Sequence, residues 1–206
     1  MNNTTKRFLS IFVGLLALIG FGSSASFYFR EPANAGFADY PTITALHVIL
    51  GGVYMALAPF QFIPQVRKNW PNFHRRSGRL LVAVGVIVGF TATLITIIFP
   101  YSGWPERIIV TPFTLLFSIA IVIGFWHVRA KRIRLHQEWM LRAFSVGLAI
   151  STQRLLFLPP LIYIIRQTGN PTESQLTFLT IVSFSLALIL HVLFAEFWIR
   201  RNRPKN

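Results

Sequence analysis

Long apolar stretches separated by short polar segments dominate the chain. A bilayer core about 30 Å thick needs about 20 helical residues to cross it, and six stretches are long enough. They cover approximately residues 8–29, 43–66, 79–99, 108–128, 138–165 and 176–199. The pattern predicts an all-α polytopic integral membrane protein with six transmembrane helices in one bundle. Residues 1–206 are expected to form a single transmembrane domain, because the short connections leave no room for a soluble one.

The first stretch has features of a signal peptide. Lys6 and Arg7 resemble a charged leader region, and Ala33-Asn34-Ala35 resembles a cleavage site. The apolar run of about 21 residues is longer than the usual 7–15 of a signal peptide. The first stretch is therefore expected to remain as an uncleaved span.

The composition excludes a water-soluble or a disordered protein. Of 206 residues, 53% are hydrophobic and only 13% are charged, whereas a soluble domain is about 25% charged. The chain contains 20 Phe, which is far too apolar for disorder. Cysteine is absent, which excludes disulfides, thiolate catalysis and cysteine-ligated metals.

Basic residues number 20 and acidic residues 6, for a formal net charge of +14. No basic segment is longer than a short loop, so no nucleic-acid partner is expected. Fifteen basic residues fall on one side of the predicted membrane and three on the other, while Arg142 and Arg154 lie inside the fifth stretch. The positive-inside rule then predicts that both termini are cytoplasmic. The expected location is a cell membrane, taken as a bacterial inner membrane, and the expected partners are anionic lipid headgroups. The fifteen are Lys6, Arg7, Arg67, Lys68, Arg75, Arg76, Arg79, Arg129, Lys131, Arg132, Arg134, Arg200, Arg201, Arg203 and Lys205, and the three are Arg30, Arg107 and Arg166.

Two stripes of small and polar residues recur at helical spacing, one in the second stretch and one in the fifth. Such stripes should face other helices or a cavity rather than lipid. We predict that His47, Gln61 and Arg154 line a route for a proton or a small solute, with close helix packing as the alternative. The stripes are His47, Gly51, Tyr54, Ala58 and Gln61, and His136, Met140, Ala143, Gly147, Ile150 and Arg154.

Prolines are expected to distort the same two stretches. Pro59 should kink the second stretch and free a carbonyl group. Pro159 and Pro160 should bend or break the fifth.

Two segments at the predicted cytoplasmic edge place a histidine beside arginines. Guanidinium groups bind headgroups, phosphates or haem propionates, although span ends also carry arginine for topology alone. No metal-ion site is expected because no local zinc-ligand spacing is present, and no catalytic residue is identified. The segments are Phe73-His74-Arg75-Arg76-Ser77-Gly78-Arg79 and His136-Gln137-Glu138-Trp139-Met140-Leu141-Arg142.

These segments, together with His47 to Gly52, Ala58-Pro59-Phe60-Gln61-Phe62 and Arg154, resemble the membrane family catalogued as domain of unknown function 2306. The resemblance runs from about residue 40 to 200 and departs at Ala58, where glycine is expected. It implies a multi-span membrane protein and brings no established activity.

A weaker likeness connects the chain to transmembrane cytochromes b, in which histidines of neighbouring helices ligate haem. It implies at most one inner haem b, ligated by His191 together with His74, His127 or His136. Arg75, Arg76 or Arg142 would hold the propionates.

Three functions remain open from the sequence. A haem- or quinone-linked transmembrane redox protein is the first expectation, and a transporter or channel for a small solute or proton is the second. An accessory scaffold without chemistry of its own is the third. The sequence names no substrate, cofactor or protein partner with certainty and leaves open whether the chain is an enzyme.

Overall fold

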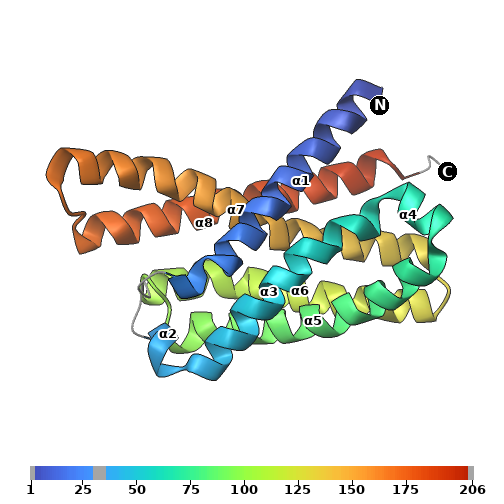
Figure 1. Ribbon diagram of the computed structural model, residues 1–206, viewed down its shortest axis with the longest axis horizontal. Helices are drawn as coiled ribbons and strands as arrows, with labels where there is room; N and C mark the ends of the chain where they lie inside the picture. The colour runs from blue at the N-terminus through green and yellow to red at the C-terminus, as the bar shows by residue number, and fades with distance from the viewer. Residues whose placement is uncertain (1–2, 30–35, 204–206) are drawn as a thin grey trace. The chain divides into compact units, whose positions relative to one another are not determined.

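The computed structural model describes residues 3–29 and 36–203, and its regular elements there are helices (Figure 1). The chain divides into two compact units, Met1–Thr91 and Ala92–Asn206, with α5 running through the boundary. The suggested cleavage site at Ala33-Asn34-Ala35 and the charges of Arg30 and Lys205 lie outside the described residues. The elements are α1 (Asn3–Ala25), a 3-10 turn (Phe27–Phe29), α2 (Gly36–Asp39), α3 (Pro41–Phe62), α4 (Pro64–Asn69), α5 (Pro71–Ile98), α6 (Trp104–Arg129), α7 (Ile133–Thr168) and α8 (Glu173–Arg201).

Five helices, α3, α5, α6, α7 and α8, are long and apolar enough to cross a membrane. Large apolar side chains are exposed along them, including Phe90 at 62% and Leu193 at 61%, which suits contact with lipid. The first predicted span, residues 8–29, ends earlier than expected, because α1 stops at Ala25 and a 3-10 turn follows at Phe27–Phe29. The all-α, multi-span prediction is thus confirmed for five of the six stretches.

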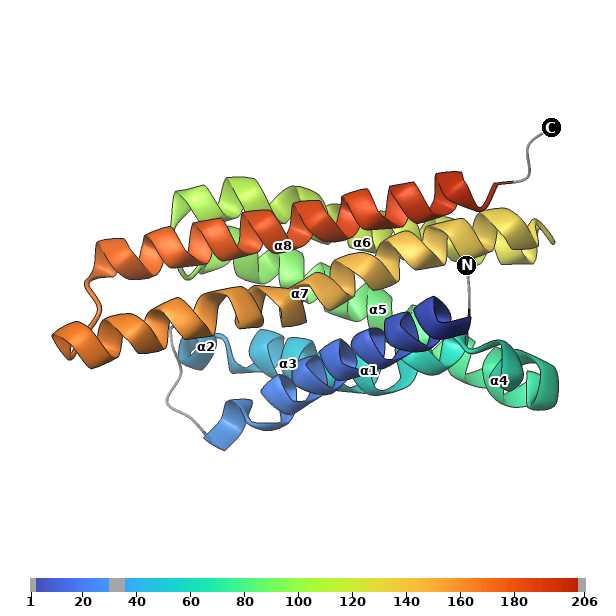
Figure 2. The same cartoon turned by 90° about the horizontal axis from the view of Figure 1, so that it is seen from above.

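In the first unit, α1 packs against α3, and the two lie side by side in both views (Figures 1 and 2). Gly52 permits a close approach there, since a Cβ at this position would lie 3.1 Å from the Cβ of Ser24. The hydroxyl of Thr44 donates a hydrogen bond to the carbonyl of Phe37 at 2.9 Å. This bond connects α2 to the first turn of α3.

The second predicted span, residues 43–66, does not form one helix. It ends at Phe62, and Ile63 is extended with φ −79° and ψ 117° before α4 begins at Pro64. Proline disfavours helical geometry in the preceding residue, which explains the break. Pro59, by contrast, is accommodated within α3. The predicted end of the second span at residue 66 is therefore wrong by four residues, while a kink at Pro59 stays a prediction.

In the second unit, α7 packs against both α6 and α8, and the three long helices lie side by side (Figure 2). The end of α5 joins them through Thr93, whose hydroxyl donates to that of Thr114 at 2.9 Å. Pro159 and Pro160 do not break the helix, because α7 is continuous from Ile133 to Thr168, and a bend there stays a prediction.

A candidate polar site between helices α7 and α8

A polar row lies between α7 and α8 in the second unit. We define it as the hydrogen-bonded side chains Glu138, Arg142, Thr152 and Gln153 of α7, and Ser183, His191 and Glu196 of α8. At 100° per residue Glu138, Arg142 and Thr152 fall within about 80° of one another, so they lie on one side of α7. From Glu138 to Gln153 the row covers about 22 Å of helix axis at the usual 1.5 Å per residue, which is most of a bilayer core.

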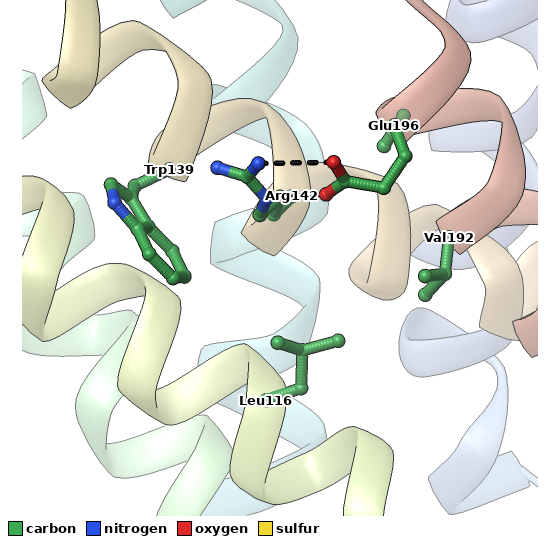
Figure 3. Close-up of a pocket in the computed structure, with 6 residues that line it drawn as sticks. Leu116, Trp139, Arg142, Val192 and Glu196 are labelled. Carbon is green, nitrogen blue, oxygen red and sulfur yellow. Dashed lines mark hydrogen bonds and ion pairs between the residues drawn. The ribbon is translucent and has the colours of Figure 1, made fainter. Parts of the chain in front are cut away.

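The strongest contact of the polar row joins Arg142 to Glu196. The guanidinium donates from Nε to Oε1 at 2.5 Å and from Nη2 to Oε2 at 3.1 Å. Side-chain exposure is 16% for Arg142 and 33% for Glu196, so the pair is largely withdrawn from the surface. The guanidinium carbon also lies 4.6 Å from the ring centre of Trp139 (Figure 3). The bidentate geometry and the indole fix the direction of the Arg142 side chain.

Glu138 ties the chain after α8 to the beginning of α7. The residue is buried, and Arg203 donates to it from Nη2 at 2.7 Å and from Nε at 3.3 Å. Arg134 adds a third contact at 3.3 Å. The Glu138 carboxylate raises the pKa of the Arg203 guanidinium, because it hydrogen-bonds and attracts its charged form.

His191 lies in the middle of the polar row. Its Nε2 is 2.8 Å from the hydroxyl oxygen of Thr152, and both side chains are half-buried. Imidazole and hydroxyl groups each donate and accept hydrogen bonds, so this contact works in either direction.

The far end of the polar row is formed by Gln153 and Ser183. The Gln153 amide donates to the Ser183 hydroxyl at 3.2 Å, and this hydroxyl donates to the Thr180 carbonyl at 3.1 Å. Nearby in the sequence, the hydroxyls of Ser151 and Thr180 are buried and have no hydrogen-bond partner within the described ranges 3–29 and 36–203.

The predicted stripe of the fifth stretch faces α6 at its beginning. His136 Nδ1 lies 2.9 Å from the Gly124 carbonyl, and a Cβ at Gly124 would come within 2.8 Å of the Met140 methyl group. This part of the stripe therefore contacts α6, while a role in binding or transport stays a prediction. His127, one turn after Gly124, is buried beside Trp126 with ring centres 4.9 Å apart.

The predicted stripe of the second stretch faces α5 within the first unit. His47 Nδ1 lies 3.2 Å from the Thr91 hydroxyl and 3.3 Å from the Val88 carbonyl. The Gln61 amide donates to the Ser77 hydroxyl at 2.9 Å. The stripe therefore faces another helix as expected, while a role in transport stays a prediction.

The remaining predicted residues are distributed over both units. Arg154 donates from Nη1 to the Ile150 carbonyl of its own helix at 3.2 Å. His74 is half-buried at the start of α5, and Arg75 beside it is exposed. Within the second unit His136 and His191 are not brought together, because His136 precedes the His191 partner Thr152 by 16 residues, roughly 24 Å along α7. Among the residues that the structure describes, no group of three or more histidine or acidic side chains converges as metal ligands.

Sequence reasoning missed most of the polar row. A helical spacing in the sequence could have indicated the polar row, since it places Glu138, Arg142, Ser145 and Thr152 on one side of α7. The prediction instead used the larger stripe from His136 to Arg154, which lies on another face of α7. Thr152, Gln153 and Ser183 carried no separate signal, since hydroxyl and amide residues are common in membrane helices.

Comparison with known families agrees with the five long apolar helices. The family model described as "Predicted membrane protein (DUF2306)" matches residues 44–199. No protein of curated function and no solved structure matches the chain, and the likeness to cytochromes b finds no support among these comparisons. The match covers about three quarters of the sequence and all five long helices almost completely. The chain therefore belongs to the DUF2306 family of multi-pass integral membrane proteins.

Proposed function

We propose that this DUF2306 member conducts protons across its membrane along the polar row between α7 and α8. The observation that carries the proposal is the His191–Thr152 hydrogen bond of 2.8 Å. It lies between the Arg142–Glu196 ion pair and the Gln153–Ser183 hydrogen bond. Histidine is suited to this role because one ring nitrogen can take up a proton while the other releases one.

The energetic cost of the polar row supports a functional role. An ionisable side chain at the centre of a membrane helix costs about 2.5–3.5 kcal/mol in insertion. Arg142, His191 and Glu196 all lie within helices that qualify as membrane spans. If close packing were the only role, apolar residues of similar volume would give it at a lower cost in free energy.

The hydrogen bonds of the polar row are not continuous. Ten residues of α7, about 15 Å of axis, separate Arg142 from Thr152, and the buried Ser145 lies between them. Ordered water bridging these groups would complete the path, as it does for other buried polar groups. In this proposal both termini are cytoplasmic, so the path runs inward from Gln153 to Glu138.

Proton flux into proteoliposomes tests the proposal. The purified protein is reconstituted with a pH-sensitive dye inside the vesicles, and a potassium diffusion potential drives protons inward. Wild-type protein should acidify the lumen, and His191→Phe should lower the initial rate about tenfold or more. Leu190→Phe, at an apolar position 55% exposed on the same helix, is the matched control. Equal rates for wild type, His191→Phe and protein-free vesicles would overturn the proposal.

A second candidate is a haem-linked redox protein, and the geometry of His136 favours it. Histidines that ligate metals almost always donate their other ring N–H to a carbonyl or carboxylate. The Nδ1 of His136 has such a partner in the Gly124 carbonyl, which leaves Nε2 for a ligand. Protein from haem-replete cells should then show a Soret band that His136→Ala removes. A colourless wild-type preparation would exclude this candidate.

A further inference from the structure

A small cavity lies where α6, α7 and α8 meet, beside the Arg142–Glu196 ion pair. It encloses about 200 Å³ and is lined by Leu116, Trp139, Arg142, Val192, Ala195 and Glu196. Figure 3 shows Arg142 between the Trp139 indole and the Glu196 carboxylate, with the Leu116 side chain across from them. Two of the six lining residues, Arg142 and Glu196, belong to the polar row.

The volume of the cavity suits a single ring. An engineered apolar cavity of about 150 Å³ is large enough to bind benzene. A cavity of about 200 Å³ therefore holds one six-membered ring with a few small substituents. Drug-sized ligands occupy about 300–1,000 Å³ and are too large.

The charges limit the occupant to a neutral molecule. Arg142 and Glu196 neutralise each other through two hydrogen bonds. An ionic ligand would find no free counterion there, because each charge of the pair is already compensated by the other. The pair uses the Nε and Nη2 donors of Arg142, and a guanidinium has five N–H groups in all. A ligand oxygen that accepts a hydrogen bond therefore suits the charged side of the cavity.

The other walls match a flat apolar ring. Leu116, Val192 and Ala195 are aliphatic, and the Trp139 indole offers a surface for stacking. All of these residues belong to helices that qualify as membrane spans, so a ligand would arrive from the lipid rather than from water.

From these properties we infer that the cavity binds a neutral, lipid-soluble ring carrying a carbonyl oxygen, the chemical class of the membrane quinones. The carbonyl oxygen accepts a hydrogen bond from Arg142, and the ring lies against Trp139 and Val192. The inference concerns binding only and does not depend on proton conduction.

Quenching of tryptophan fluorescence by duroquinone, a single-ring quinone, tests this inference in protein reconstituted into lipid nanodiscs. The wild type should show saturable quenching above the linear loss caused by quinone dissolved in the lipid. Trp139→Phe should lose the saturable part, because the other four tryptophans lie outside the cavity lining. Val192→Phe fills part of the cavity while keeping both members of the ion pair, and it should raise the apparent Kd about tenfold or more.

The control is Leu193→Phe, which adds the same bulk at a neighbouring position that is 61% exposed and outside the cavity lining. Its Kd should equal that of the wild type. If circular dichroism and gel filtration show that Val192→Phe does not fold, Ala195→Val adds a smaller obstruction. This variant should also raise the apparent Kd. Purely linear quenching of the wild type would overturn the inference. A saturable signal unchanged by Trp139→Phe and by the filling variant would overturn it as well. Neither outcome bears on proton flux, so the two proposals fail separately.

Discussion

The Arg142 guanidinium on α7 and the Glu196 carboxylate on α8 are joined by two hydrogen bonds of 2.5 and 3.1 Å. The two residues are 54 positions apart in the chain. Because both lie within long apolar helices, each compensates the charge of the other where water is scarce. The pair joins α7 to α8 and forms one wall of the cavity beside it.

Removing one member of this pair should be more harmful than removing both. Glu196→Ala leaves the Arg142 charge unpaired and should lower the free energy of unfolding by about 2 kcal/mol, less than for a fully buried pair because Glu196 is 33% exposed. Arg142→Met combined with Glu196→Leu should recover most of this loss, since neither charge remains. Thermal unfolding of the wild type and of these two variants in detergent measures the difference. A double variant as unstable as Glu196→Ala would show that the ion pair itself is not responsible.

Gly124 should tolerate one added carbon and no more. A Cβ there would lie 2.8 Å from the flexible end of Met140 and 3.4 Å from the Cβ of Trp139. Met140 can move its terminal methyl group, so Gly124→Ala should cost under about 1 kcal/mol. Gly124→Leu should cost several times more, because it separates α6 from α7.

The Gly124 prediction is checked by the unfolding temperature of each variant with and without Met140→Ala. Met140→Ala should remove the whole loss of unfolding temperature caused by Gly124→Ala, but only part of the loss caused by Gly124→Leu. If Met140→Ala restored neither variant, contact with Met140 would not be the cause of the loss.

The bond from Arg203 to Glu138 should slow opening of the last turn of α8. Arg203 donates to both carboxylate oxygens of the buried Glu138, although its own side chain is 50% exposed. Arg203→Ala should therefore accelerate amide hydrogen exchange near Arg201 while leaving the middle of α8 unchanged. The exposed Arg200 provides the control, because Arg200→Ala removes a neighbouring charge but not this contact. If both variants accelerated exchange equally, the cause would be the loss of a positive charge near the end of α8 rather than the loss of the contact with Glu138.

The helices were largely predictable from the sequence, because length and apolarity suffice to identify a membrane-spanning helix. The errors lie at prolines, because a proline can end a helix at one position and be accommodated at another. Pro64 ends α3 because Ile63 before it is extended, whereas α7 continues through Pro159. The α7 face of the polar row was readable from the spacing of Glu138 and Arg142. Its α8 partners were not, because they depend on how far two antiparallel helices are shifted along each other. That shift is a property of packing rather than of either helix alone.

Loss of the hydroxyl group should destabilise the protein at Ser183 but not at Thr180. The Ser183 hydroxyl accepts from Gln153 and donates to the Thr180 carbonyl, so Ser183→Ala leaves the Gln153 amide unpaired. This variant should lower the free energy of unfolding by about 1–3 kcal/mol.

The Thr180 hydroxyl is buried without a partner among residues 36–203, so Thr180→Val keeps the shape and removes a desolvated polar group. Its free energy of unfolding should stay equal to that of the wild type or rise by up to about 1 kcal/mol. Chemical unfolding in mixed micelles, followed by tryptophan fluorescence, measures both variants. Destabilisation of Thr180→Val to the extent of Ser183→Ala would mean that the Thr180 hydroxyl holds an internal water. A drop in proton flux of this same variant would then place that water on the path past His191.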